Sequence, residues 1–208
     1  NLTDLIDIGV FGLYYPSLDT PIVTNGTFDD DIDDWDDLST TNTGSYSVSW
    51  DSSTSRLKMN SSSNGDSAGD YKSMVGQDIS HNFVSGEGYK LKVKLYRVSE
   101  RQFLRFGLVV CDLDDTLTAS PSEPISEYWN VNDVTSGSEL TLNFTATSSH
   151  SSGLKIGIYL FDYGNSAGSV VGTVLVDDVK LTDSSDNEIK SFGEIGRAHV
   201  WTPVTRSS

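Results

Sequence analysis

The sequence contains little cysteine, little basic charge and no long apolar run. Its single cysteine, Cys111, rules out an intrachain disulfide and a zinc site built from several cysteines. Lysine and arginine total 14 against 30 acidic residues, which gives a net charge of −16. Because that charge repels a polyanion, we expect no nucleic-acid partner. No apolar stretch is long enough to cross a membrane as a helix, so we also expect no membrane insertion.

Helical periodicity is missing as well, and alternation takes its place. Tyr89, Leu91, Val93 and Leu95 share one face of an extended segment, while the three lysines between them share the other. Similar patterns predict strands over residues 45–50, 56–60, 71–79, 102–111, 127–131, 140–146, 154–162 and 173–182. The intervening segments are rich in Ser, Asn, Gly and Asp, which favour loops over helices. The sequence therefore predicts one all-β domain, a sandwich or a barrel, and we expect an antiparallel β-sandwich.

We place this sandwich at residues 20–183, between an N-terminal flanking segment (1–19) and a tail (184–208). The chain begins without methionine or a signal-peptide pattern, so we expect an internal cut from a longer protein or a deliberately trimmed start. Residues 194–208 break with the acidic, alternating character of the rest. They resemble the translation of a common sequencing adapter, although Trp201 stands where the adapter usually encodes a stop. We expect 194–208 to be an artefact of a gene truncated in an environmental assembly, and they carry no functional interpretation.

One stretch suggests an enzyme. The apolar run that ends in the acidic residues 112–115 resembles the first motif of haloacid-dehalogenase-type phosphatases. The resemblance implies that Asp112 is the nucleophile and Asp114 the acid or base of a magnesium-assisted phosphoryl transfer. That fold needs helices between parallel strands, whereas the following residues predict strands and serine-rich loops. His81 and His150 lie in polar surroundings and are predicted to be solvated, and no Ser-His-Asp set is identifiable. We expect no enzyme, with the phosphatase as an outside alternative.

Two motifs bracket the predicted sandwich. Asn25-Gly26-Thr27-Phe28-Asp29, followed by Trp35, stands near its start, and Val176-Asp177-Asp178-Val179 stands near its end. With Gly88-Tyr89 between them, this order resembles the jelly-roll carbohydrate-binding modules of families four, nine and twenty-two. The resemblance covers about residues 20–182 and implies a jelly-roll sandwich that binds carbohydrate without catalysis. Phe28 and Trp35 are apolar anchors in an acidic segment, so we expect both to be buried.

The same resemblance implies a structural Ca²⁺ ion held between the two motifs, by Asp29 and Asp177, with Thr27 and Asp178 adding oxygens. Calcium prefers six to eight oxygen ligands, which carboxylates and carbonyls supply. Asp29 stands where the family usually has the longer Glu. The acidic run over residues 30–37 lacks the spacing of an EF-hand. We therefore favour a solvated loop for it, with a set of metal ligands as the alternative.

Sugar binding needs aromatic faces that stack on pyranose rings, together with polar groups that reach the hydroxyls. Strand alternation leaves such residues on the side opposite the aliphatic ones. The predicted ligand-binding residues are Phe103, Arg105, Tyr128, Trp129, Tyr159, Phe161 and Tyr163. An aromatic row of this kind is either an open ligand platform or the second layer of a thicker core.

The predicted function is non-catalytic carbohydrate binding by an aromatic-lined sheet face, with a polysaccharide or glycan as partner. We expect the protein to be extracellular, on a cell surface or on a virion, with other domains of a longer chain or virion subunits as further partners. The alternative is a structural or adhesion domain of a phage particle or bacterial surface protein, in which the aromatic residues pack against virion subunits.

Overall fold

The computed structural model describes residues 20–39, 46–63, 72–99, 104–117, 125–162 and 170–191. These residues form strands and two short 3-10 helices, η1 (Val131–Asp133) and η2 (Ser148–Ser151). The strands are β1 (Thr20–Pro21), β2 (Asp36–Asp37), β3 (Ser47–Asp51), β4 (Arg56–Ser63), β5 (Lys72–Ile79), β6 (Gly88–Ser99), β7 (Leu104–Asp112), β8 (Ser126–Asn130), β9 (Ser138–Thr145), β10 (Leu154–Asp162), β11 (Val170–Asp183) and β12 (Lys190–Ser191). No helix among the described residues is long and apolar enough to span a membrane.

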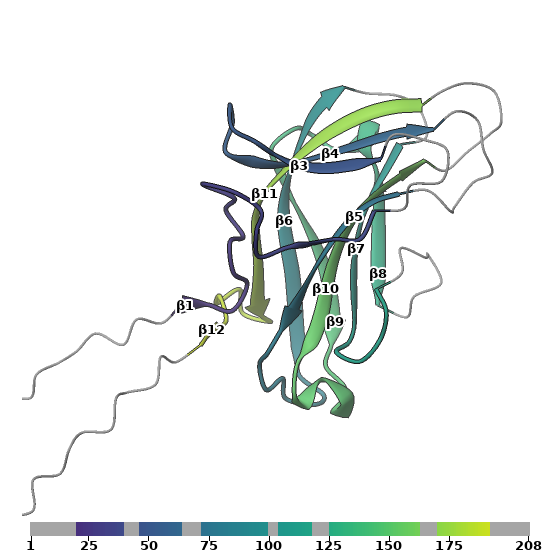
Figure 1. Cartoon of the computed structure of the whole chain (residues 1–208). Coiled ribbons are helices and arrows are strands. Elements are labelled where there is room, and N and C mark those ends of the chain that lie inside the picture. The colour runs from purple at the N-terminus through teal and green to yellow at the C-terminus, as the bar shows by residue number, and fades with distance from the viewer. Residues whose placement is uncertain are drawn as a thin grey trace, which may run out of the picture.

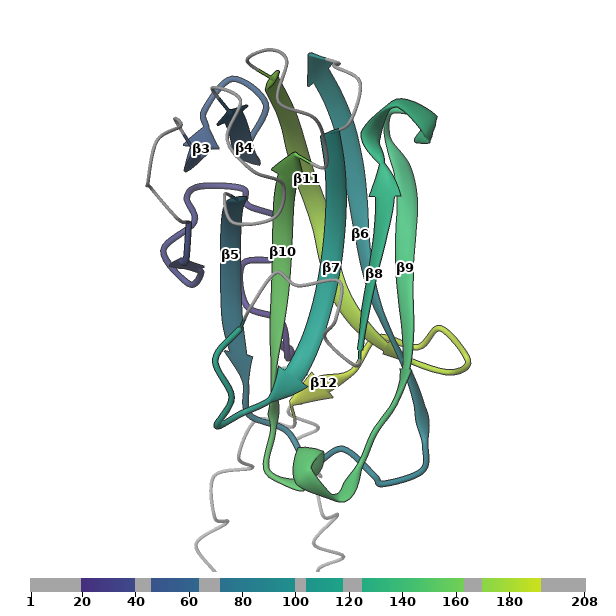
Figure 2. The same cartoon turned by 90° about the vertical axis from the view of Figure 1, so that its right-hand side faces the viewer.

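Two five-stranded sheets pack face to face (Figures 1 and 2). One has the strand order β2-β5-β10-β7-β8 and is called the aromatic sheet below; the other, β3-β4-β11-β6-β9, is called the lysine sheet. Every pairing within them is antiparallel. The prediction of an all-β antiparallel sandwich is confirmed. Within the described residues the strands pair antiparallel, which disagrees with the parallel α/β fold that the phosphatase alternative needs.

The core lies between the sheets and follows from the period of two along each strand. Leu91, Val93 and Leu95 of β6 face inward, as do Ile156 and Ile158 of β10, and all five side chains are fully buried in one cluster. Burying a side chain of this size contributes about 1.5–3 kcal/mol. The residues that alternate with them therefore form the two outer faces of the sandwich, and any surface for recognition on a sheet must use these faces.

The two bracketing motifs meet in space. The backbone N–H of Val179 donates to the carbonyl oxygen of Gly26 at 2.8 Å, and a Cβ at residue 26 would lie 2.1 Å from the Val179 carbonyl oxygen. Only glycine permits this approach. Phe28 and Trp35 are buried with ring centroids 5.6 Å apart, as predicted. The Asn-Gly-x-Phe motif therefore packs the start of the domain onto the end of β11.

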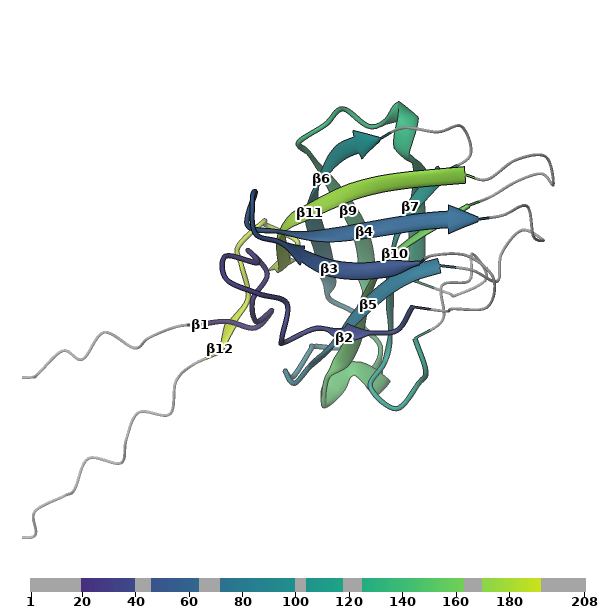
Figure 3. The same cartoon turned by 45° about the horizontal axis from the view of Figure 1, so that its top comes forward.

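Strand β11 bends where the second motif begins. Its register with β6 shifts between Asp177 and Lys180, and Asp178 has a φ of 50°. An irregularity of this kind bends a strand and increases its twist. In Figures 1 and 3, β11 curves strongly along its length, and β4 and β3 follow it in the sheet.

The described chain continues past the predicted boundary at residue 183. Glu188 forms a bridge with Thr182, and β12 pairs with β1 beside the lower end of β11 (Figure 1). The backbone N–H of Ile22 donates to the carbonyl of Ile189 at 3.1 Å. Residues 184–191 therefore fold back onto the sandwich. The predicted flanking segment 1–19 and the adapter-like residues 194–208 lie outside the described residues.

Candidate functional site

The outer face of the aromatic sheet brings four of the predicted ligand-binding residues together. In the sheet register Phe161 lies opposite Arg105, Tyr159 lies opposite Gly107, and Gly107 lies opposite Tyr128. The ring centroids of Tyr159 and Phe161 are 5.4 Å apart, and those of Phe161 and Tyr128 are 6.2 Å apart, edge to face. The Arg105 guanidinium carbon lies 4.6 Å from the Tyr128 ring centroid, a cation–π arrangement.

These four residues are not equally exposed. Tyr128 is 42% exposed and Arg105 is half-buried, whereas Tyr159 is 0% and Phe161 is 4% exposed. Tyr159 and Phe161 form a small second cluster with Met74 and Val109, outside the main core. For these two rings the second-layer alternative is the one that the structure shows. They lie on the predicted face, but as the support beneath it, and Tyr128 is the ring that solvent reaches.

Trp129 does not belong to this face, which corrects the prediction. It pairs with Phe106 in the register and packs against the main core between the sheets. Neighbouring residues of a strand point to opposite sides, so Tyr128 and Trp129 cannot share a face. A signal was present in the sequence, because Ile125, Trp129 and Val131 fall in one phase of the alternation. Phe103 and Tyr163, the remaining two predicted residues, lie outside the described residues.

The phenol of Tyr159 is unusual within this cluster. Its hydroxyl is buried and has no hydrogen-bond partner in the described part of the chain. Its ring passes over Gly107, where a Cβ would lie 2.1 Å from Cζ of Tyr159. Burial, with a smaller contribution from neighbouring Tyr128, raises the pKa of the Tyr159 hydroxyl to about 12. The glycine thus creates the space in which the second layer of rings packs.

The exposed end of the face is held in place by polar contacts. Nε of Arg105 donates to Oδ1 of Asn130 at 3.3 Å, and Nδ2 of Asn130 donates to Oδ2 of Asp133 at 2.9 Å. These two hydrogen bonds hold the Arg105 guanidinium against the Tyr128 ring. Asn130 and Asp133 were not among the predicted site residues, because the link depends on a turn into η1 that alternation does not reveal.

Among the four predicted calcium ligands, Asp177 and Asp178 pair with basic side chains, whereas Thr27 and Asp29 bond to each other. Oδ2 of Asp177 lies 3.1 Å from Nε of Arg56, and its Oδ1 accepts the backbone N–H of Asp178 at 2.8 Å. Asp178 forms an ion pair with Lys94, and Asp29 accepts a hydrogen bond from Thr27 at 2.8 Å. No group of three or more potential metal ligands occurs within the described ranges. These pairings engage the Asp177 and Asp178 carboxylates, and the calcium ion stays a prediction of the sequence resemblance.

The Asp112 region has a structural role in this arrangement. Oδ1 of Asp112 lies 3.0 Å from Nε2 of His150 and accepts a hydrogen bond from the Ser149 hydroxyl at 2.7 Å. Nδ1 of His150 accepts the backbone N–H of Thr147. Both imidazole nitrogens are therefore engaged, and neither faces Ser149 as a general base. His150 is 1% exposed, which makes the prediction of a solvated histidine wrong; it anchors η2 to the end of β7.

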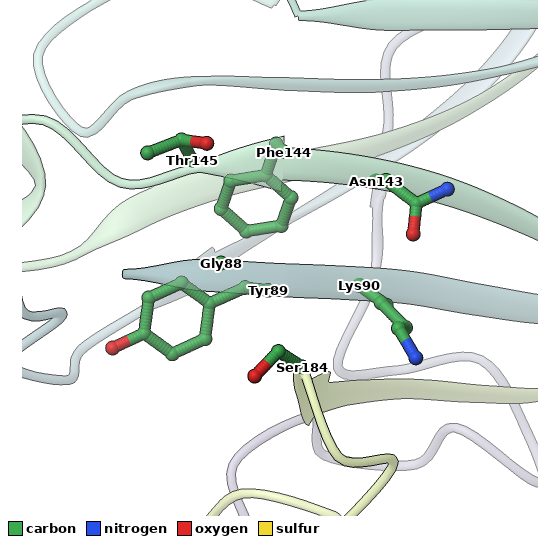
Figure 4. A pocket seen from close by; sticks show the side chains of 7 residues that line it. All are labelled: Gly88, Tyr89, Lys90, Asn143, Phe144, Thr145 and Ser184. Carbon is green, nitrogen blue, oxygen red and sulfur yellow. The ribbon is translucent and has the colours of Figure 1, made fainter. Parts of the chain in front are cut away.

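The outer face of the lysine sheet has a different character. Lys92 pairs with Glu139 and Asp186, both at 2.9 Å, and Lys180 pairs with Glu139 at 3.1 Å. A hollow of about 240 Å³ opens beside Gly88, with Lys90 and Asn143 at one end and the rings of Tyr89 and Phe144 at the other (Figure 4). Both rings are buried and Lys90 pairs with Asp186. This hollow therefore has no open aromatic surface.

Comparison with known proteins identifies the fold. No family model and no curated protein matches the sequence. A solved family 28 carbohydrate-binding module, described as specific for non-crystalline cellulose, matches with a TM-score of 0.53 and 14% identity, over 78% of this chain and 95% of its own. A family 4 module matches with a TM-score of 0.52 and 14% identity, over 77% of this chain and 99% of its own. The enzymatically active domain of tailspike protein 4 from bacteriophage CBA120 has a TM-score of 0.50 and 14% identity, over 78% of this chain and 21% of its own. The fold is thus the two-sheet β-sandwich that these solved carbohydrate-binding modules also have.

Proposed function

We propose that this chain is a non-catalytic carbohydrate-binding module that binds a glycan on the outer face of the aromatic sheet. The observation that carries the proposal is Tyr128, a 42% exposed residue whose ring lies at 84° to Phe161 and has the Arg105 guanidinium carbon 4.6 Å from its centroid. A rigid aromatic with polar groups fixed beside it is what a sugar ring requires for stacking and for hydrogen bonds to its hydroxyls. Tyr128 is the platform, and Arg105 and Asn130 are the polar partners.

The charge of the protein narrows the ligand class. At a net charge of −16 the chain repels uronic acids and sulfated sugars at long range, so the proposed ligand is a neutral glycan. The modules of similar fold, one of them described as binding non-crystalline cellulose, support a polysaccharide ligand. We also propose an extracellular, cell-surface or virion location, where such a ligand is available.

Affinity electrophoresis in gels that contain a soluble neutral polysaccharide tests this proposal. We expect cellulose-type β-glucan, mannan, xylan or galactan to retard the wild-type chain, and Tyr128→Ala to abolish the retardation. Tyr96→Ala is the matched control, because Tyr96 lies on the other sheet with Arg56 3.8 Å above its ring. A folded wild type that no glycan retards, or equal losses in the two variants, contradicts the proposal.

A second candidate is a structural or adhesion domain of a phage particle. The tailspike domain of similar fold favours it, since that β-sandwich belongs to a virion protein. In this case the Tyr128 face packs against another subunit. The same electrophoresis separates the candidates, because a packing surface gives no retardation by free polysaccharide.

A structural calcium ion stays a prediction of the sequence resemblance alone. It requires Arg56 and Lys94 to release Asp177 and Asp178. Thermal unfolding with calcium and with a chelator tests it. The resemblance predicts a higher melting temperature with calcium in the wild type and no such rise in Asp177→Asn, whereas equal melting temperatures in all samples contradict a calcium site.

A further inference from the structure

A second hollow lies on the outer face of the aromatic sheet, toward its β2 edge. It has a volume of about 200 Å³ and opens among Asp36, Leu38, Gly76, Asp78, Leu117 and Lys155. In the register Asp36 lies opposite Gly76, and Asp78 lies opposite Lys155, so these four residues occupy one face of adjacent strands. This is the same face that carries Tyr128 at the β8 edge.

Glycine pairing leaves room for the leucine walls of the hollow. Gly76 and Gly157 lie directly opposite each other in β5 and β10. A Cβ at residue 76 would lie 2.5 Å from Cδ1 of Leu117 and 3.0 Å from Cδ1 of Leu38, and a Cβ at residue 157 would lie 3.2 Å from Cδ2 of Leu117. Two leucines therefore stand on a floor without side chains, and they form apolar walls beside the opening.

The polar part of the hollow is held by a buried amide. Oε1 of Gln77 accepts the backbone N–H of Thr24, and its Nε2 donates to the carbonyls of Thr24 and Asp34, all at 3.0 Å. The backbone N–H of Leu38 donates to the carbonyl of Met74 at 2.9 Å. The acidic segment that carries Asp36 is thereby fixed to β5, and the wall it forms is in place before any ligand arrives.

The chemistry of the lining suits a neutral sugar. Asp36 and Asp78 are exposed carboxylates that can accept hydrogen bonds from hydroxyls, while Leu38 and Leu117 offer apolar surface to the C–H groups of a ring. The Lys155 ammonium donates to the carbonyl of Asp115 at 2.9 Å, so it braces the loop that presents Leu117. Apolar walls and a few fixed acceptors suit the C–H groups and hydroxyls of one sugar unit, whereas a free ion would make no use of the apolar walls.

We propose that this hollow, walled by Leu38 and Leu117, is a second sugar subsite that binds another unit of the same glycan chain as Tyr128. The inference rests on the proposed function. From β8 to β2 there are four strand spacings of about 4.8 Å, or roughly 19 Å across the face, which is room for several sugar units. Leu117 packs against the aromatic cluster and also lines the hollow, so it separates the two subsites. The face therefore recognises an internal stretch of a chain, not a single terminal sugar.

Calorimetric titration with two-unit and six-unit oligosaccharides of cellulose, mannan, xylan and galactan tests the subsite. For the series that binds, we expect Asp78→Ala to weaken the six-unit affinity about tenfold, because hydrogen bonds to a charged group are lost. The affinity of Asp78→Ala for the two-unit oligosaccharide, which occupies only the Tyr128 subsite, should equal that of the wild type. Asp114→Ala is the control, an exposed acid of the neighbouring turn that does not line the hollow.

The outcomes separate the two proposals. If no series binds the folded wild type, the proposed function fails and the subsite fails with it. If a series binds and Tyr128→Ala abolishes binding, but Asp78→Ala and Leu38→Asp leave the six-unit affinity unchanged, the subsite is wrong and the carbohydrate-binding face stands.

Discussion

The two outer faces of the sandwich arise from the same alternation but differ in what the alternation exposes. On the lysine sheet, residues that leave the core are charged, and they pair with acids from β9 and from the turn after β11. On the aromatic sheet they are rings, glycines and small apolar residues that pack into a second cluster, with Tyr128 and Arg105 at its exposed end. The lysine sheet is thus covered by ion pairs, and the aromatic sheet is covered in part by a second layer of packed rings and apolar side chains.

This difference shows how a small sandwich can restrict recognition to one side. Exposed ion pairs contribute little to stability, about 0–1 kcal/mol each, but they keep the lysine face hydrated and unattractive to apolar partners. The aromatic face places rigid rings beneath a single open tyrosine, and its glycines give Tyr159 and Leu117 room to pack. The 42% exposed Tyr128 therefore lies on the aromatic sheet, whereas the Tyr96 ring of the lysine sheet is half-buried beneath Arg56.

The largest effect is expected where the second layer of rings meets a glycine. In Gly107→Ala the new Cβ would lie 2.1 Å from Cζ of Tyr159, so the variant should lose about 2–3 kcal/mol of unfolding free energy through overpacking. Gly88→Ala on the lysine sheet is the matched change, because its Cβ would lie 3.7 Å from Cβ of Ser184, an ordinary contact. Urea denaturation measures both. Equal losses would remove the contrast between the faces.

A smaller effect is expected from the buried hydroxyl of Tyr159. Tyr159→Phe removes an unpartnered buried oxygen and should stabilise the protein by about 1 kcal/mol at neutral pH. Because the folded-state pKa is raised to about 12, the neutral phenol is compatible with the fold below pH 10, and stability is lost as pH rises from 10 toward 12. Tyr159→Phe should lack that alkaline loss, and Tyr96→Phe should retain it. Denaturation at several alkaline pH values tests this, and identical profiles would contradict it.

The smallest effect belongs to the ion pairs of the lysine sheet. Hydrogen bonds from Lys90 and Lys92 lower the pKa of Asp186 to about 2 from its ordinary 3.8. Its contribution is therefore present above about pH 4 and is lost as pH falls toward 2. Asp186→Asn should melt slightly lower than the wild type at neutral pH and equally at pH 2, and salt should shrink the difference. A difference that grows on acidification would be inconsistent with this pairing.

Much of the fold could be predicted from the sequence because burial follows local alternation. Alternation predicts the strand that contains Leu91, and the apolar character of Phe28 and Trp35 in an acidic segment predicts their burial. The meeting of the two bracketing motifs is implied by the family resemblance instead, and the structure has it. Arg105, Tyr128, Tyr159 and Phe161 were also predicted to share a face. The prediction is wrong for Trp129, because Trp129 follows Tyr128 directly in the strand and the two side chains must point to opposite faces.

The rest depends on contacts between strands that are distant in sequence. Whether a ring on the outer face is open depends on what packs over it, and alternation gives no information on that for Tyr159. The opposition of Gly76 and Gly157 requires the register of β5 and β10, which one sequence does not supply. The engagement of Asp177 by Arg56 likewise joins residues 121 positions apart. These are the features that decide the shape of the candidate site.

Chemical-shift mapping of backbone amides, during titration with an oligosaccharide of the polysaccharide that retards the protein, tests the central claim most directly. Recognition on the aromatic sheet predicts shifts concentrated on β7, β8 and β10, around Arg105, Tyr128 and Phe161, and extending toward Gly76. The amides of β6 and β9 around Lys92 and Glu139 should stay unchanged. Shifts centred on the lysine sheet, with the β7–β8 amides unaffected, would contradict the assignment of recognition to the aromatic face.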